Sequence, residues 1–217
     1  MDKDNWLFPV IATVLVIIVG AGVGYVLENI GHSQASGSNE YHLNLVITTN
    51  NYYNASVGYQ PAYFVLSGGK LVSSENITLP SNTLIMVTIF CFDAGNGTPA
   101  PQFLKVAGTT GNQEFIINNT NVNSTGTGSG INVVGGKEVS SVNQSVVAHT
   151  FTIVNFFGSG SDLNIPVPES SVVQASFNTG SSGTFAWQCE VPCGTGSSGW
   201  DGSMASAGWM QGNVIVS

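Results

Sequence analysis

The C-terminal stretch of the chain, residues 183–217, reads GTFAWQCEVPCGTGSSGWDGSMASAGWMQGNVIVS. Its start alternates between polar and apolar side chains, and this alternation predicts a β-strand that ends at Cys189. Its end predicts a second β-strand, which the chain enters through Met210. The loop between the two strands is rich in Gly and Ser and carries a second cysteine, Cys193. Two strand ends and their loop can hold sulfur atoms a few ångströms apart on a rigid frame, so this stretch predicts a cluster of sulfur ligands.

A histidine upstream adds a nitrogen donor to this cluster. His149 lies in the alternating stretch VAHTFTI, residues 147–153, which predicts another strand. Imidazole, thiolate and thioether groups together form the copper sites that use soft donors. The candidate metal ligands are therefore His149, Cys189, Cys193 and Met210.

The same residues carry a family resemblance. The region from about residue 77 to 217 resembles the cupredoxin family, and the run WQCEVPCG, residues 187–194, resembles the copper loop of subunit II of haem-copper terminal oxidases. In that family two cysteines three residues apart bridge a dinuclear copper centre, joined by a His from an earlier strand and by a His and a Met after the second Cys. The resemblance implies an all-β, Greek-key cupredoxin-like β-sandwich. It assigns these roles to Cys189, Cys193, His149 and Met210, the last within MQGNVIV.

One family ligand has no counterpart, because no histidine follows Cys193 and its place falls near Ser197. A thioether is too weak a donor to replace an imidazole, so we expect an incomplete copper site. We therefore expect no bound cofactor, and a bound copper ion is the alternative. The resemblance to quinol-oxidising members then implies a subunit II-like component of a respiratory terminal oxidase. We expect other membrane subunits of that complex as partners, and no catalytic residue in this chain.

Two further functions stay open at this point. One is a mononuclear copper electron-transfer protein that uses the same candidate ligands. The other is a glycosylated surface protein with a structural or adhesive role. Hydrolase and nucleotide chemistry are not expected, because the chain shows no Ser/His/Asp set, paired carboxylates, phosphate-binding glycine loop or zinc spacing.

Each candidate ligand also has a plainer interpretation. A single histidine on an apolar strand is often a packed core residue. Cys189 and Cys193 are candidates for a disulfide if no metal binds outside the cell, which leaves Cys91 as the odd thiol, although its pairing with either of them is not excluded. Met210 and Met204, close in sequence to two tryptophans, are also typical of a packed lid or a docking surface.

Composition restricts the partners and the setting. Only 7% of the residues are charged, Lys and Arg together number 4, and the net charge is −8, which excludes a nucleic-acid partner. In strong acid the carboxylates would be protonated while Lys and Arg stay charged, so a surface rich in ion pairs would gain net positive charge. A neutral polar surface avoids this, and we therefore expect an exterior facing an acidic medium. Glycans are the other expected solubilising device, at six candidate sequons: Asn54, Asn76, Asn96, Asn118, Asn123 and Asn143.

The N-terminal region predicts membrane attachment. Residues 6–27 form an uncharged apolar run long enough to cross a bilayer as a helix, whereas a cleaved signal peptide would have a shorter apolar region and a more basic start. We therefore expect a transmembrane anchor in residues 1–30 and a linker in residues 31–40. The extracytoplasmic domain, residues 41–217, would face outward from a single-pass membrane protein of the cell membrane.

Within this domain, hydrophobic alternation predicts seven to nine strands, beginning with residues 41–49, 63–66 and 84–92. No stretch has a convincing helical period, so helices should be short. Residues from about 93 to 145 interrupt the family pattern and are rich in Gly, Asn and Thr. We expect an inserted hairpin with a long loop there. This insert would either contact a partner subunit or form a glycosylated surface excursion.

Overall fold

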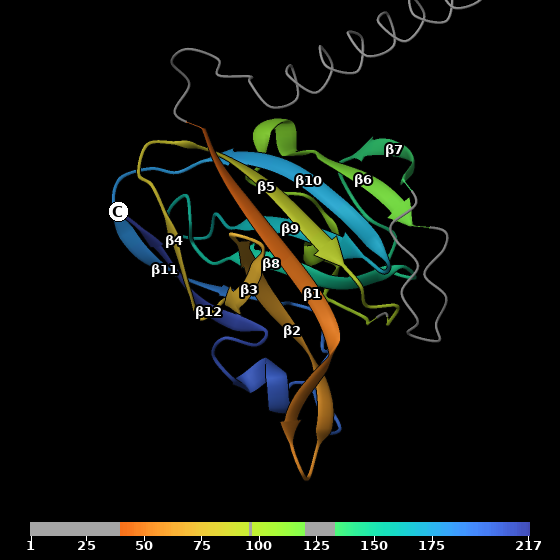
Figure 1. Ribbon diagram of the computed structural model, residues 1–217. Helices are drawn as coiled ribbons and strands as arrows, with labels where there is room; N and C mark the ends of the chain where they lie inside the picture. Colours follow the sequence, from red (N-terminus) through yellow and green to blue (C-terminus); the bar gives the residue numbers. More distant parts are fainter. Residues whose placement is uncertain (1–39, 96, 120–132) are drawn as a thin grey trace, which may run out of the picture. The chain divides into compact units, whose positions relative to one another are not determined.

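The structure is a computed structural model that describes residues 40–95, 97–119 and 133–217. Within these residues the chain forms two β-sheets and three short 3₁₀ helices (Figure 1). The strands are β1 (Glu40–Asn54), β2 (Gly58–Ser67), β3 (Lys70–Ser73), β4 (Asn76–Leu79), β5 (Leu84–Cys91), β6 (Glu114–Asn119), β7 (Val133–Val139), β8 (Val147–Ile153), β9 (Leu163–Pro168), β10 (Ser171–Asn178), β11 (Gly183–Gln188) and β12 (Gln211–Val216). The helices are η1 (Pro101–Leu104), η2 (Thr110–Asn112) and η3 (Gly202–Ala205).

The larger sheet has seven strands in the order β3-β2-β1-β5-β10-β6-β7. Strands β1 and β5 pair in parallel, and the other neighbours in this sheet pair antiparallel. The smaller sheet has five strands in the order β4-β12-β11-β8-β9, with β4 and β12 parallel. Because its central strand β11 pairs with both β12 and β8, the C-terminal hairpin and the His149 strand lie next to each other.

The core lies between the two sheets. Strand β5 alternates buried and more exposed positions, as a strand with one face on the core does. Side chains of both sheets meet in one hydrophobic cluster, including Leu45 and Val173 from the larger sheet and Phe151, Trp187 and Val214 from the smaller one. The predicted all-β sandwich is therefore confirmed.

Strands β8 and β9 are buried on both faces, along their whole length. Their second face is covered by the segment after β5. The Asn164 side-chain amide donates to the carbonyls of Phe103 and Lys105 at 3.1 and 2.7 Å, and Ala107 bridges to Asn164 through the backbone. The segment around η1 thus covers β9, the strand that pairs with the His149 strand β8.

The described residues contain twelve strands, so the prediction of seven to nine is wrong. The excess comes from short edge strands such as β3 and β4 and from the β6–β7 hairpin, which extends the larger sheet beyond β10. Within the expected insert at about 93–145, β6 and β7 form a hairpin, and residues Pro101–Leu104 form the 3₁₀ helix η1, because Pro101 favours a first helical turn. The prediction of short helices is confirmed in the described part.

No helix among the described residues is long and apolar enough to cross a bilayer. The predicted anchor at residues 1–30 and the linker at residues 31–40, except Glu40 at the start of β1, lie outside these residues, as do the sequons at Asn96 and Asn123. Asn54, Asn76 and Asn143 are exposed, so their glycosylation stays a prediction that their positions permit. Asn118 lies on β6, and its glycosylation also stays a prediction.

Candidate metal centre

Neighbouring strands of the smaller sheet bring the predicted histidine and cysteines together. His149 lies on β8 directly after a register shift against β9, and Cys189 follows the last residue of β11. Strands β8 and β11 pair antiparallel through Gln188 and Thr152, so the end of β11 lies beside the end of β8 and Cys189 follows on the side toward His149. A bulge next to His149 re-aims its side chain relative to a regular strand. The local pairing therefore places the imidazole beside the cysteine loop.

The three donor atoms of His149, Cys189 and Cys193 lie within 4.8 Å of one another. The Sγ atoms of the two cysteines are 3.9 Å apart, and Cys189 Sγ is 3.8 Å from His149 Nδ1. His149 and Cys189 are fully buried, whereas Cys193 is half-buried. The arrangement therefore presents one nitrogen and two sulfur atoms at one end of the core.

A thioether extends this cluster. The Sδ atom of Met204, on η3, lies 3.3 Å from Cys193 Sγ, and Met204 is 7% exposed. The family resemblance assigned the thioether to Met210, and the sequence around Met204 and Met210 was also typical of a packed lid or a docking surface. Met210 is fully buried, and its carbonyl accepts a 2.8 Å hydrogen bond from the Cys189 amide. Metal ligation by the Met210 side chain stays a prediction, while Met204 is the methionine that the structure places on a thiol.

Close packing in the cysteine loop positions Met204. The loop closes on itself through hydrogen bonds from the Gly194 amide to the Gly199 carbonyl and between the backbones of Thr195 and Asp201. A Cβ atom at Gly194 would lie 2.0 Å from the Asp201 carbonyl oxygen and 2.8 Å from Met204 Cγ. Only glycine fits there, because no larger residue leaves room for both neighbours.

A carboxylate outside the predicted ligand set holds the histidine. Asp93 Oδ2 lies 2.9 Å from His149 Nε2, on the side of the ring opposite to the sulfur atoms. Asp93 follows the core strand β5 by two residues. From the sequence, Asp93 was expected only as the start of an insert. The available signal was an acidic residue just after a buried strand in a chain with very few charges.

Protonation of the cluster follows from these contacts. Burial opposes charge on His149, but the hydrogen bond to Asp93 and the neighbouring Cys189 raise the pKa of His149 to about 9. Burial likewise opposes ionisation of Cys189. The hydrogen bonds from Cys193, His149 and the Thr150 amide nevertheless hold the pKa of Cys189 well below its usual range. The pKa of Cys193 is raised, because it donates to Cys189 and is itself buried. Cys189 is therefore the thiol that ionises first.

Aromatic side chains form the inner wall behind the imidazole. The ring of Tyr63 is 6.2 Å from that of His149 and 5.2 Å from that of Trp187, which is in turn 5.6 Å from Phe151. The hydroxyl of Tyr63 donates to the Thr150 carbonyl at 3.0 Å. All these side chains are fully buried, so the centre borders a dry, rigid part of the core.

No protein-family model matches the chain, and no curated protein sequence matches it. Among solved structures it is similar to auracyanin B, with a TM-score of 0.35 and 12% identity over 84% of this chain and 91% of that one. It is also similar to a multi-copper oxidase from Pediococcus acidilactici, with a TM-score of 0.33 and 11% identity over 86% of this chain and 28% of that one. A blue copper oxidase from Nitrosomonas europaea gives a TM-score of 0.31 and 11% identity over 81% of this chain and 42% of that one.

The donor set decides which metal fits. Two thiols, an imidazole and a thioether are soft donors, which copper(I) accepts, whereas zinc is held by thiolate, imidazole and carboxylate groups. Two sulfur atoms bound to one tetrahedral ion at about 2.3 Å lie about 3.8 Å apart. The 3.9 Å between the two Sγ atoms matches this separation. The separation therefore suits one tetrahedral ion bound by both cysteines, and the thioether of Met204 is the donor that favours copper over zinc.

The two cysteines are thiols in the structure, as is Cys91. A sulfur separation of 3.9 Å is well beyond the bond length of about 2.05 Å in a disulfide. The disulfide between Cys189 and Cys193 stays a prediction for the oxidised protein without metal. Cys91 is buried at the end of β5, and burial raises its pKa to about 12, so it is a less reactive thiol than Cys189.

Proposed function

We propose that the described domain is a cupredoxin-like electron-transfer domain that holds a single copper ion. His149, Cys189, Cys193 and Met204 would be the ligands. The observation that carries this proposal is the approach of one imidazole nitrogen and two thiol sulfurs to within 4.8 Å of one another. Met204, which contacts Cys193, would supply the thioether in place of Met210, while the second histidine of the family has no counterpart here.

The protein groups around the cluster suit one-electron chemistry. A copper ion bound here would supply a one-electron couple. The ligands come from β8, the end of β11 and the loop after it, so the sandwich holds them in place before metal arrives. The Thr150 amide donates to Cys189 Sγ at 3.4 Å and stabilises negative charge on the sulfur. Burial of His149 and Cys189 excludes water from that side of the site.

Four protein ligands leave no position for a substrate, which favours electron transfer over catalysis at the metal. Cys193 is the most exposed of the four, being half-buried where the other three are buried. An electron would therefore enter or leave most directly on the side of the loop that carries Cys193.

The respiratory assignment is a finer proposal. The CEVPC loop at residues 189–193 supports it through its resemblance to oxidase subunit II. We propose a membrane-anchored, extracytoplasmic subunit that works with other membrane subunits of a terminal oxidase. Copper analysis of the complex extracted in detergent, together with identification of the co-purifying haem proteins, tests this assignment separately from the metal site.

Metal analysis of the full-length chain tests the copper site. The wild-type chain, reconstituted with copper and freed of excess metal, should hold one copper per chain and show visible absorption from thiolate bound to Cu(II). Cys189→Ser should lose both signals, because it removes the thiol that ionises first. Cys91→Ala is the matched control, since it removes a buried thiol outside the cluster.

Three outcomes would contradict the proposal. The first is a colourless, copper-free wild type after reconstitution. The second is equal loss of copper in Cys189→Ser and Cys91→Ala. The third is displacement of copper by an equimolar amount of zinc, which would show that the thioether does not contribute to selectivity.

A further inference from the structure

We infer that Asp93 is a positioning residue for the metal centre. It fixes the His149 ring so that Nδ1 faces the thiols, and its negative charge lowers the reduction potential of the bound copper. This inference rests on the proposed copper site and assigns a role to a residue outside the ligand set. The proposal follows from the contacts of Asp93 on both sides of its side chain.

Asp93 is held from several directions. Its Oδ1 accepts a 2.7 Å hydrogen bond from the Gly95 amide, while Oδ2 faces His149 Nε2 at 2.9 Å. Its carbonyl accepts a 2.8 Å hydrogen bond from the Ser170 amide and a 3.6 Å contact from Cys91 Sγ. Backbone and side chain are thus both fixed, which leaves the carboxylate little freedom to turn away from the imidazole.

A carboxylate can only accept hydrogen bonds, so the ring nitrogen facing it carries the hydrogen. Nε2 of His149 therefore keeps its hydrogen, and Nδ1, which donates to Cys189 in the copper-free protein, is the nitrogen that can give up its proton to bind a metal. Nδ1 is the atom that lies 3.8 Å from Cys189 Sγ. Such carboxylate–histidine pairs orient metal ligands in proteins, and their loss typically lowers metal affinity by about 10 to 100 times.

The charge of Asp93 has a second effect. The side chain is only 14% exposed, and its partner His149 is fully buried, so water screens the charge weakly. A nearby negative charge stabilises copper(II) more than copper(I), because the oxidised ion carries the larger positive charge. Reduction adds one electron and requires no bond change at Asp93. The carboxylate therefore favours the oxidised form and lowers the potential.

Two variants of the full-length chain separate orientation from charge. Asp93→Asn keeps an oxygen acceptor for Nε2 but removes the charge. It should lower Cu(II) affinity about tenfold or more and Cu(I) affinity less. Each tenfold difference between the two raises the potential by about 59 mV. Asp93→Ala also removes the acceptor, so the Nε2–H signal of His149 in ¹⁵N NMR of the copper-free protein should exchange rapidly with solvent.

Asp201→Asn is the matched control, because it removes one negative charge from an exposed residue of the cysteine loop. It should leave the potential close to that of the wild type. An unchanged potential and Cu(II) affinity in Asp93→Asn would overturn the inference, as would equal shifts in Asp93→Asn and Asp201→Asn. Asp93→Glu should restore part of the affinity if the carboxylate itself is what matters.

The experiment also separates this inference from the proposed function. A wild-type chain without copper would refute the copper site and, with it, the effect of Asp93 on the potential. The NMR measurement on the copper-free protein would still decide the orientation. A protected Nε2–H in the wild type that is lost in Asp93→Ala supports the orienting role, and an unchanged signal refutes it.

Discussion

Met204 and Met210 have different surroundings although both are buried methionines near one loop. The sulfur of Met204 lies 3.3 Å from the sulfur of Cys193. The side chain of Met210 packs in the core just before β12, and its backbone carbonyl accepts a hydrogen bond from the Cys189 amide. A backbone contact survives any side-chain change, so the two positions respond differently to loss of the thioether.

Replacing each methionine by leucine tests which sulfur belongs to the centre. Met204→Leu should weaken Cu(I) binding and change the visible spectrum, because a soft donor is lost. Met210→Leu should leave both nearly unchanged and cost less than about 1.5 kcal/mol of stability, as volume-conserving core exchanges do. Cu(I) competition titration and absorption spectroscopy measure the two effects. A spectrum that changes only in Met210→Leu would restore the original assignment of the thioether.

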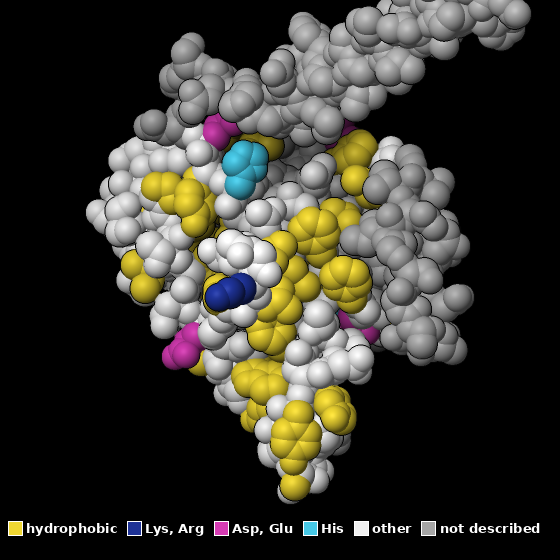
Figure 2. All heavy atoms as spheres, viewed as in Figure 1, with side chains coloured by type: hydrophobic (Ala, Val, Ile, Leu, Met, Phe, Trp, Pro, Cys, Tyr) yellow, Lys and Arg dark blue, Asp and Glu magenta, His cyan; other side chains and the backbone are white. Residues whose placement is uncertain are grey.

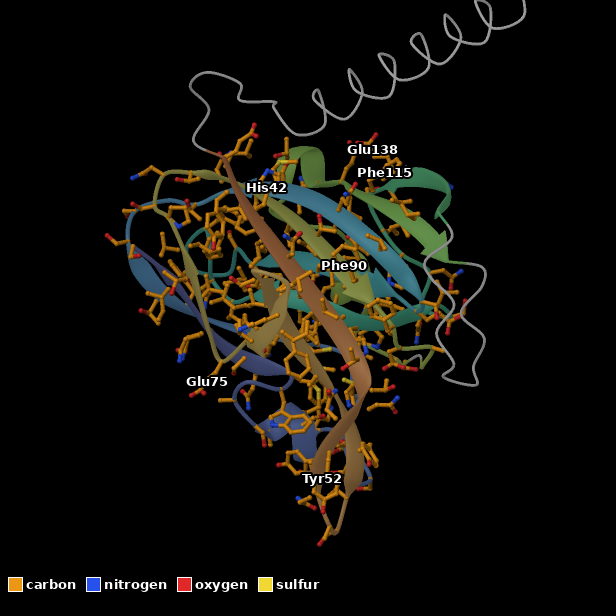
Figure 3. All side chains as sticks on the ribbon, in the orientation of Figure 1. His42, Tyr52, Glu75, Phe90, Phe115 and Glu138 are labelled. Atoms are coloured by element: carbon orange, nitrogen blue, oxygen red, sulfur yellow. The ribbon has the colours of Figure 1, made fainter. Side chains whose placement is uncertain are left out.

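Glu114 is a second buried ionisable residue, away from the metal centre. It is 2% exposed, and neither carboxylate oxygen has a hydrogen-bond partner. Its neighbour Phe115, paired with Glu138 across β6 and β7 (Figure 3), is exposed, so Glu114 faces the opposite side of the sheet. Burial raises the pKa of Glu114 from 4.5 to about 9, which keeps it neutral in the folded protein below that pH.

Glu114→Gln should therefore stabilise the protein in alkali and have little effect in acid. An acid with a raised pKa in the folded state binds its proton more tightly there. The wild type accordingly loses stability as pH rises from about 4.5 toward 9, by up to about 1.4 kcal/mol per pH unit. Urea unfolding at pH 5 and pH 9 measures this, with exposed Glu138→Gln as control. An equal difference between variant and wild type at both pH values would contradict it.

At the level of elements, the cysteine loop and the β1–β2 hairpin support each other. The hydroxyl of Tyr53, on β1, is 2.7 Å from the Ser206 Oγ, and the Tyr53 ring packs edge-on against Trp209 at 4.9 Å. Figure 3 shows Tyr52 at the far end of this hairpin, where it is 61% exposed. The long hairpin thus braces the segment that carries Met204.

Gly194→Ala should disturb this loop more than the rest of the fold. The added methyl group would meet the Asp201 carbonyl and the Met204 side chain, so the loop must shift and separate Met204 from Cys193. We expect weaker Cu(I) binding and a loss of about 1 to 3 kcal/mol in stability. Gly180→Ala is the control, because nothing lies within 4 Å of a Cβ atom there. Equal copper affinity in both variants would show that the loop adapts without loss of the site.

For the molecule as a whole, the scarcity of charge has a structural counterpart. The single ion pair that the described residues form is Asp93 with His149, inside the metal centre. Figure 2 shows one face on which charged side chains are few and scattered among polar and hydrophobic ones. Acidification should break few ion pairs on a surface of this kind, because the surface carries few pairs of opposite charge.

The copper-free protein should consequently be more stable at pH 5 than at pH 9. His149, with a pKa raised to about 9, contributes stability that is complete below about 6.5 and is lost as pH rises through 9. Glu114 acts in the same direction between about 4.5 and 9. Below this range the lowered pKa of Asp93 opposes the trend, because its contribution disappears once the carboxylate is protonated. Thermal unfolding across this pH range measures the effect, and a maximum near pH 9 would contradict it.

Salt supplies a separate test of the same surface. Because the ion pair is largely buried, sodium chloride between about 0.01 and 0.5 M should shift the unfolding midpoint little, as it screens mainly exposed charges. A strong dependence on salt would indicate surface pairs outside the described residues.

The sequence by itself determined the all-β class and the strands around the cysteine loop. These features are local: alternation along each strand sets which face is buried, and the position of a cysteine at a strand end sets where its sulfur lies. By contrast, the number of residues between His149 and Cys189 does not predict how close the two side chains lie in the fold. Their proximity was inferred from resemblance and is a result of the pairing of β8 with β11.

Tertiary structure alone decided the remaining parts of the centre. Asp93 reaches His149 because β5 ends beside β8 from the opposite sheet, a relation that no sequence period encodes. Met204, rather than Met210, contacts Cys193 because the loop folds back tightly at Gly194. The physical reason is the same in both cases: alternation fixes what a strand exposes locally, whereas contacts between distant segments depend on how the two sheets and their loops pack.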